Sequence, residues 1–182
     1  YGRWSNILLC RITDNAMSNR YLYDIAEKFA FDASATDIKP LGEGFINDTY
    51  IVTTDKSRYI LQRKNHIVFP DVEAMMDNIW RVTTHLKAKV KASGGDPLRE
   101  VLTVIPTTDG KLFYRDNENF WAASLFIEGS VTHDVADTPR LAYMGGRGIG
   151  RFQAMLADFD EEEYKALFQK RTGNSQCLGA GS

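Results

Sequence analysis

The stretch KPLGEGFINDTYIVTTDKSRYILQRK, residues 39–64, constrains the fold of this chain more than any other. Within it, residues 47–53 and 58–63 are rich in β-branched and aromatic side chains, and the turn TDKS joins them. Two such runs with a short connection predict a pair of antiparallel strands. The glycines at positions 42 and 44 therefore precede a strand rather than a helix. A Walker loop and a dinucleotide-binding fingerprint both require a helix after their glycines, so the sequence excludes both motifs.

The remaining patterns place this stretch in a mixture of helices and strands. Leu22, Ile25, Ala26 and Phe29 recur at the spacing of a helix that opens near Met17. The order of elements lacks the regular alternation of parallel α/β folds, so it predicts the α+β class with an antiparallel sheet. The other predicted elements are a strand over 37–41, a helix over 71–89, a hairpin of residues 101–106 and 111–115 around the turn TTDG, an apolar run over 120–129, and a helix from Thr138 to Phe159.

The last predicted helix combines an apolar stripe with several glycines. Each glycine inside a helix costs about 1 kcal/mol relative to alanine, so this helix should either pack closely on another element or break. If its packing partner lies outside this chain, the stripe is exposed, and we expect the protein to self-associate. The stripe consists of Leu141, Met144, Phe152, Met155, Leu156 and Phe159, and the glycines are Gly145, Gly146, Gly148 and Gly150.

Charge and composition limit the classes of partner that the chain is expected to bind. Its 182 residues carry a formal net charge of −2 and are 43% hydrophobic, which fits one globular domain or a lobe with part of another. No concentration of basic residues predicts a nucleic-acid partner, and no apolar run approaches the length of a membrane span. The cysteines, Cys10 and Cys177, lie near opposite ends, so neither a disulfide framework nor a metal site is predicted. Small molecules and proteins remain as partners, and we expect a cytoplasmic location.

A glycine loop between two antiparallel strands is the arrangement with which kinase-like proteins cover nucleotide phosphates. Such a loop needs a cation, and the alternation of a strand places Arg63 on one face with Tyr59 and Leu61. Lys64 is the competing candidate. Glu73, in the first turn of the next predicted helix, is the expected ion-pair partner of Arg63. The alternatives are a plain turn at the glycines, a solvated Arg63, and a Glu73 that only stabilises its helix terminus.

Four segments together resemble the N-terminal portion of the N-acetylhexosamine 1-kinases: LGEGFINDTYIV, YILQRKNHIVFPDVEAMMDNI, SLFIEGSVTHD and GRFQAMLADF. These enzymes belong to the aminoglycoside phosphotransferase and choline kinase family, which has the protein-kinase-like fold. The resemblance implies a kinase-like N-lobe and hinge over 17–129 and the start of a C-lobe over 130–169. Residues 1–16 are then expected to be a non-native or disordered leader, and residues 170–182 an aberrant or disordered tail.

The resemblance also implies an activity and a set of binding residues. The activity is transfer of a phosphoryl group from ATP, with Mg²⁺, to a small-molecule hydroxyl in carbohydrate metabolism, with an N-acetylhexosamine as the acceptor. A loop covers the ATP phosphates, Arg63 and Glu73 form the cation and its partner, and the hinge over 125–129 meets the adenine. The implied cofactor-binding residues are Gly42, Gly44, Phe45, Asn47, Asp48, Thr49, Arg63, Glu73, Phe126, Ile127 and Glu128.

The departures from the family pattern are equally informative. The family's catalytic loop has a histidine, an aspartate two positions later and an asparagine five beyond that. His133 and Asp134 are adjacent, and Pro139 stands where the asparagine would follow Asp134, so no catalytic loop is assigned. The residue after Trp121 is often arginine in this family, whereas here it is Ala122. We therefore expect an incomplete kinase that is inactive alone; the alternative is a non-catalytic nucleotide-binding or interaction module that reuses a kinase N-lobe.

Overall fold

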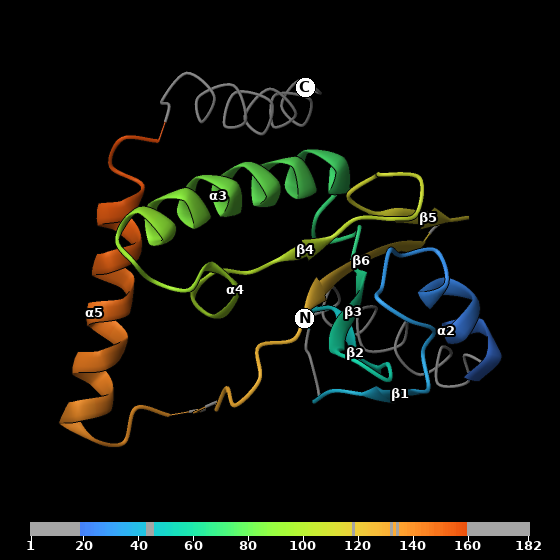
Figure 1. Ribbon diagram of the computed structural model, residues 1–182, viewed down its shortest axis with the longest axis horizontal. Coiled ribbons are helices and arrows are strands. Elements are labelled where there is room, and N and C mark those ends of the chain that lie inside the picture. Colours follow the sequence, from blue (N-terminus) through green and yellow to red (C-terminus); the bar gives the residue numbers. More distant parts are fainter. Residues whose placement is uncertain (1–18, 43–45, 118, 132, 134, 160–182) are drawn as a thin grey trace, which may run out of the picture. The chain divides into compact units, whose positions relative to one another are not determined.

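The structure is a computed structural model that describes residues 19–42, 46–117, 119–131, 133 and 135–159. Contacts divide the chain into two compact units, Tyr1–Val68 with Val104–Phe126 and Phe69–Thr103 with Ile127–Ser182. The predicted ends, 1–16 and 170–182, lie outside the described residues. The helices are α2 (Asn19–Ala26), α3 (Val72–Ala92), α4 (Pro97–Glu100) and α5 (Pro139–Met155), and the strands are β1 (Asp37–Pro40), β2 (Asp48–Thr53), β3 (Arg58–Lys64), β4 (Val104–Ile105), β5 (Tyr114–Asp116) and β6 (Asn119–Leu125) (Figure 1).

The first unit is built on an antiparallel sheet. Its strands follow the order β1-β2-β3-β6-β4, and β5 also pairs with β6. The hairpin of β2 and β3 runs from the pair Thr53 and Arg58 to the pair Asp48 and Arg63. The predicted strands 47–53 and 58–63 are therefore confirmed to within one residue. The sheet and its helices belong to the α+β class, as the order of elements predicted.

The predicted hairpin of residues 101–106 and 111–115 is wrong in its pairing. The turn itself exists, because Thr107 N–H donates to the Lys111 carbonyl at 2.8 Å. The flanking strands, however, each pair with β6: β4 lies opposite residues 123–124, and β5 lies opposite residues 119–121. The long strand β6 offers a full ladder to both short strands, whereas the local alternation in the sequence indicated only that the two segments are extended.

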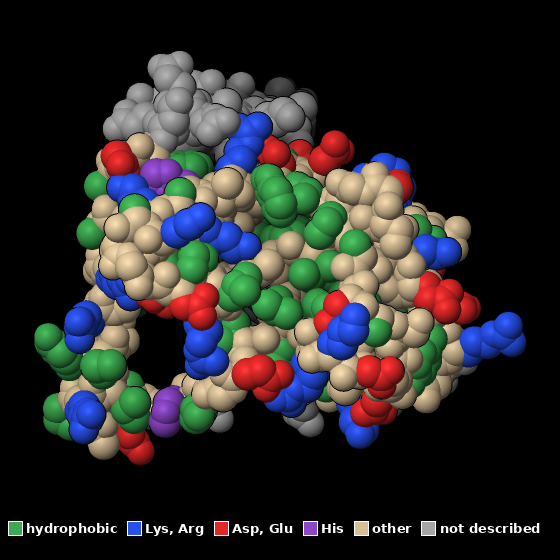
Figure 2. Space-filling model, viewed as in Figure 1, with side chains coloured by type: hydrophobic (Ala, Val, Ile, Leu, Met, Phe, Trp, Pro, Cys, Tyr) green, Lys and Arg blue, Asp and Glu red, His purple; other side chains and the backbone are tan. Residues whose placement is uncertain are grey.

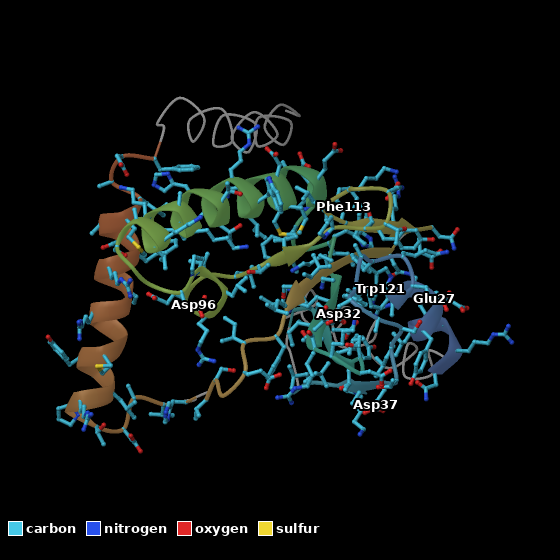
Figure 3. The ribbon with its side chains drawn as sticks, in the orientation of Figure 1. Glu27, Asp32, Asp37, Asp96, Phe113 and Trp121 are labelled. Carbon is cyan, nitrogen blue, oxygen red and sulfur yellow. The ribbon has the colours of Figure 1, made fainter. Side chains whose placement is uncertain are left out.

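One face of the sheet, called the α2 face below, carries the core of the first unit. Helix α2 buries Leu22, Ile25 and Ala26, as their helical spacing predicted. Cross-strand pairs place Val52 with Tyr59, Leu61 with Ala123, and Arg63 with Trp121 on that same face. The ring of Trp121, labelled in Figure 3, is fully buried and lies 6.1 Å from the ring of Tyr21, centroid to centroid. The core cluster is Leu22, Ile25, Ala26, Phe29, Ile38, Val52, Tyr59, Leu61, Trp121 and Ala123.

The other face of the sheet, called the second face below, has a different composition. The same register places Thr49 opposite Gln62, Ile51 opposite Ile60, and Lys64 opposite Phe120. Ala122 and Ser124 of β6 lie on this face as well, opposite Gln62 and Ile60. The second face therefore mixes polar, small and large apolar side chains, whereas the α2 face carries the apolar core and, at one end, the pair of Asp48 and Arg63.

The second unit is helical. Asp71 caps α3, since its Oδ1 accepts the N–H of Ala74 at 2.8 Å, so the helix begins one residue after its predicted start. The short helix α4, capped by Asp96, was not predicted. A small core joins the C-terminal part of α3 to the C-terminal end of α5; it contains Leu86, Val90 and Val101, with Val82, Met155 and Leu156 packed around them.

Helix α5 begins where the sequence predicted, with Thr138 as its cap: Leu141 N–H donates to Thr138 Oγ1 at 3.2 Å. It continues unbroken through its glycines, and an added Cβ at Gly145 or Gly148 would meet nothing within 4 Å. Its apolar stripe is largely exposed, because none of the residues of α5 is buried and only its last turn joins the small core. Figure 2 shows hydrophobic side chains among basic ones along this helix. None of the described helices is long and apolar enough to cross a membrane.

Candidate functional site

The glycine loop connects β1 to β2, and its base is closed. Leu41 N–H donates to the Thr49 carbonyl at 2.8 Å, so the chain leaves and re-enters the sheet at adjacent positions. Gly42 has a φ of +68°, a conformation that costs an L-residue strain, and an added Cβ there would meet no atom within 4 Å. Glycine is therefore needed at position 42 for its backbone conformation. The predicted phosphate-loop residues Gly44 and Phe45 lie outside the described residues.

The first residues after the loop each bind the end of β3 through a side chain. Asn47 Oδ1 accepts the N–H of Asn65 at 3.0 Å. Asp48 Oδ2 accepts from Arg63, with Nε at 2.7 Å and Nη2 at 2.5 Å. Thr49 Oγ1 accepts from Gln62 Nε2 at 3.1 Å. These contacts, called the loop clamps below, tie the base of the glycine loop to the basic end of β3.

The two candidate cations lie on opposite faces of the sheet. Arg63 shares a face with Tyr59 and Leu61, as the alternation predicted, but this is the α2 face with its apolar core. The guanidinium pairs with Asp48, and Nη1 lies 3.5 Å from Asn119 Oδ1. Only 18% of the Arg63 side chain is exposed. The structure thus places Arg63 in an ion pair at the edge of the core.

Lys64 points to the second face. Its Nζ donates to Gln62 Oε1 at 2.7 Å, and Gln62 in turn donates to Thr49, so a chain of side chains runs from the loop base to the ammonium. Burial lowers the pKa of Lys64 below its ordinary value of 10.5. Within the described residues, no carboxylate forms an ion pair with Lys64. Its charge is held in place by an amide and is not neutralised by an acidic residue of that part of the chain.

Sequence reasoning missed Gln62, which links Thr49 to Lys64. The alternation of side chains along the strand could have identified Gln62, because the period of two that places Arg63 on one face with Leu61 also places Gln62 on one face with Lys64. What the period does not show is which of the two faces is closed by a helix of the same unit. Helix α2 decides that, since it covers the face of Leu61.

The predicted partner Glu73 lies in the first turn of α3, in the second unit, whereas Arg63 lies in the first. The pairing of Glu73 with Arg63 therefore stays a prediction. Asp48, for which the family resemblance implied a place over the phosphates, binds Arg63 in this structure.

The predicted hinge residues are partly engaged in hydrogen bonds. The boundary between the two units falls between Phe126 and Ile127. Phe126 N–H donates to the Arg58 carbonyl at 3.0 Å, and the Arg58 guanidinium lies 4.5 Å from the centre of the Phe126 ring. The Ile127 carbonyl accepts from Ser130 N–H at 3.4 Å, and the Glu128 carbonyl accepts from Arg99 Nη1 at 2.8 Å. A role for these backbone groups at an adenine stays a prediction.

Metal ligands do not converge in the described part of the chain: there, no three His, Cys, Asp or Glu side chains form a group suited to a metal ion. His133 is exposed, and Asp134 lies outside the described residues. These residues therefore assign no position to Mg²⁺, which stays an implication of the family resemblance.

Comparisons with known proteins add little beyond this geometry. No family model matches the chain. Among solved structures, the chain is similar to spectinomycin phosphotransferase, APH(9)-Ia, whose crystal structure is a complex with ADP and spectinomycin. The identity is 15% and the TM-score is 0.41, and the match covers 64% of this chain and 32% of that chain. This chain thus corresponds to less than half of that protein, and a likeness at this level establishes neither a family nor an activity.

Proposed function

We propose that this chain is the nucleotide-binding part of an ATP-dependent phosphotransferase, and that its loop after Gly42 and its Lys64 bind the phosphates of ATP. The observation that carries the proposal is the hydrogen-bonded chain from Thr49 through Gln62 to Lys64, which starts at the base of the glycine loop. It places a cation at the end of the hairpin where the loop begins, and we propose the backbone amides of that loop as further phosphate ligands. Both are needed to bind a polyphosphate.

The second face of the sheet is the face that suits the nucleotide. Side chains of α2 and the sheet fill the α2 face, where Val52, Leu61 and Trp121 have no exposed surface. On the second face, Ser124 is small and only partly buried, which suits the approach of a flat base. Arg63 is consequently replaced by Lys64 as the proposed phosphate-binding cation.

The chemistry proposed for these residues is positioning and charge neutralisation. Phosphoryl transfer requires little covalent work from a protein, so fixed amides and cations account for most of the catalytic effect. ATP supplies the phosphoryl group. The acceptor is proposed to be a small-molecule hydroxyl, of the N-acetylhexosamine 1-kinase type, in the cytoplasm; this finer assignment rests on the sequence resemblance alone.

Calorimetric titration with ATP tests the proposal. The unmodified protein is expected to bind ATP, and Lys64→Met should weaken binding by about 1.5–3 kcal/mol, the usual value of a hydrogen bond to a charged group. Lys56→Met is the matched control, because Lys56 is exposed at the turn at the other end of the same hairpin. Absence of ATP binding by the unmodified protein, or equal losses in both variants, would contradict the proposal.

A transfer assay separates the kinase from a module that only binds nucleotides. The kinase proposal predicts that a gene product carrying a downstream His-x-Asp-x₄-Asn phosphorylates N-acetylglucosamine or N-acetylgalactosamine, and that the present residues alone bind ATP without transfer. A gene product that binds ATP but lacks such a motif and any transfer activity supports the non-catalytic module.

A further inference from the structure

We propose that the ion pair of Asp48 and Arg63 positions the groups that bind phosphate; this inference rests on the proposed function. The pair lies on the α2 face and touches no phosphate itself. Its role is to hold the base of the glycine loop and the residue before Lys64 in one fixed relation. Both residues thereby act on the nucleotide through others.

The geometry of the pair suits a rigid link. Both Nε and Nη2 of Arg63 bind the same oxygen, Asp48 Oδ2, at 2.7 and 2.5 Å. The side chains are 18% exposed for Arg63 and 35% exposed for Asp48, so solvent screens the pair only in part. Asn119, in the neighbouring strand β6 of the sheet, lies within 3.5 Å of Arg63 Nη1 and limits its movement from the other side.

The position of the pair explains what it controls. Asp48 is the first residue of β2, directly after the loop, and Arg63 directly precedes Lys64. The neighbouring clamps, Asn47 with Asn65 and Thr49 with Gln62, have neutral partners. The charged clamp is therefore the strongest of the three, since charge-assisted hydrogen bonds are about twice as strong as neutral ones. Without this ion pair, the base of the loop and Lys64 are no longer held in a fixed position relative to each other.

An acidic residue that only stabilises the hairpin serves as a comparison for Asp48, and Asp32 is such a residue. At the other end of the hairpin, Asp32 accepts from Thr54 Oγ1 at 2.8 Å and from Ser57 Oγ at 2.6 Å, and so holds the turn between β2 and β3. Figure 3 labels Asp32. This second acidic residue also stabilises the hairpin but lies at the end away from the glycine loop. Asp32→Asn is thus a matched control for Asp48→Asn.

The experiment is a calorimetric series with ATP and with adenosine, together with thermal unfolding of each variant. Asp48→Asn should weaken the binding of ATP by about tenfold and change the binding of adenosine by less than about twofold, because only the phosphates depend on the clamp. Asp32→Asn should lower the unfolding temperature and leave the affinities for both ligands unchanged. Asp48→Glu, which keeps the charge, should recover part of the lost ATP affinity, and Arg63→Lys serves if Asp48→Asn does not fold.

The outcomes separate this inference from the proposed function. If the unmodified protein binds ATP and Asp48→Asn binds it equally well, the positioning role is wrong while the proposed function stands. If Asp48→Asn weakens ATP and adenosine alike, or Asp32→Asn has the same effect on ATP, the pair is merely structural. If the unmodified protein binds no ATP, the proposed function fails and this inference fails with it.

Discussion

The two faces of the sheet differ in composition although they share the same strands. On the α2 face, Val52, Leu61 and Trp121 are completely buried in a core that α2 closes. On the second face, Thr49, Gln62 and Lys64 form a hydrogen-bonded chain and keep part of their surface exposed. Leu61 and Gln62 are neighbours in sequence, as are Arg63 and Lys64. A step of one residue along a strand therefore separates a residue that stabilises the fold from one that is proposed to bind a ligand.

The largest effect is expected from the core. Leu61→Ala removes a side chain with no exposed surface and should lower the free energy of unfolding by about 2–5 kcal/mol. Ile60→Ala, its neighbour on the second face, is the control and should cost less than half as much, because Ile60 is only partly buried. Urea denaturation measures both. Equal costs would show that the two faces do not differ in this way.

The second prediction concerns the hydrogen-bonded chain. Gln62→Ala removes the contacts to Thr49 and Lys64 and should weaken ATP binding by about 0.5–1.5 kcal/mol for each neutral hydrogen bond lost, with little change in stability. Gln153→Ala, an exposed glutamine of α5, is the matched control for calorimetry. A Gln62 variant that loses stability but keeps its ATP affinity would assign the chain to folding instead.

The third prediction compares two glycines with open surroundings. Gly42→Ala should lower the free energy of unfolding by about 1 kcal/mol, because φ is +68° and alanine is strained there. Gly146→Ala, inside α5, should raise it by about the same amount through helix propensity. Denaturation curves of both variants check the signs. A stabilising Gly42→Ala would mean that the loop does not need its left-handed residue.

The smallest effect is expected from Tyr21, a residue of helix α2 that packs against the core on the α2 face. Desolvation by burial, and the hydrogen bond that Tyr21 donates to Asp116 Oδ2 at 2.5 Å, raise the pKa of Tyr21 to about 12. The folded state holds this proton more tightly than the unfolded state, whose pKa is about 10. The contribution is thus complete below pH 10 and is lost as the pH rises through 12. Because Tyr21 is partly exposed, we expect at most about 1 kcal/mol.

Tyr21→Phe provides the control for this pH dependence. The other tyrosines titrate in both proteins, so only the difference between their unfolding free energies is informative. This difference should shrink as the pH rises from 10 to 12. A difference that stays constant over this pH range would show that the ionisation of Tyr21 does not affect the stability of the fold.

The strands of the hairpin were predictable because their signals are local. Alternation and a short turn set the limits of β2 and β3 to within one residue. The pairing of β4 and β5 was not predictable, since both segments look extended and only the tertiary structure shows that each one joins β6. Likewise, the apolar stripe of α5 indicated which face of the helix would pack, but whether that face is buried depends on a partner that periodicity does not reveal.

The candidate site shows the same limit at the scale of single residues. The sequence grouped Arg63 correctly with Leu61, yet it did not show that α2 covers this face and that Asp48 binds the guanidinium. Lys64 was named as the competing cation, and Gln62 was missed. The positions of Gly44 and Phe45 within the loop, and the pairing of Glu73, stay predictions.

Hydrogen exchange with and without ATP tests whether the glycine loop and Lys64 bind phosphates on the second face. We expect slower amide exchange over residues 41–49 on saturation with ATP, and no change in α2 over residues 19–26. Unchanged exchange in the loop at saturating ATP, or protection confined to α2, would contradict the proposal.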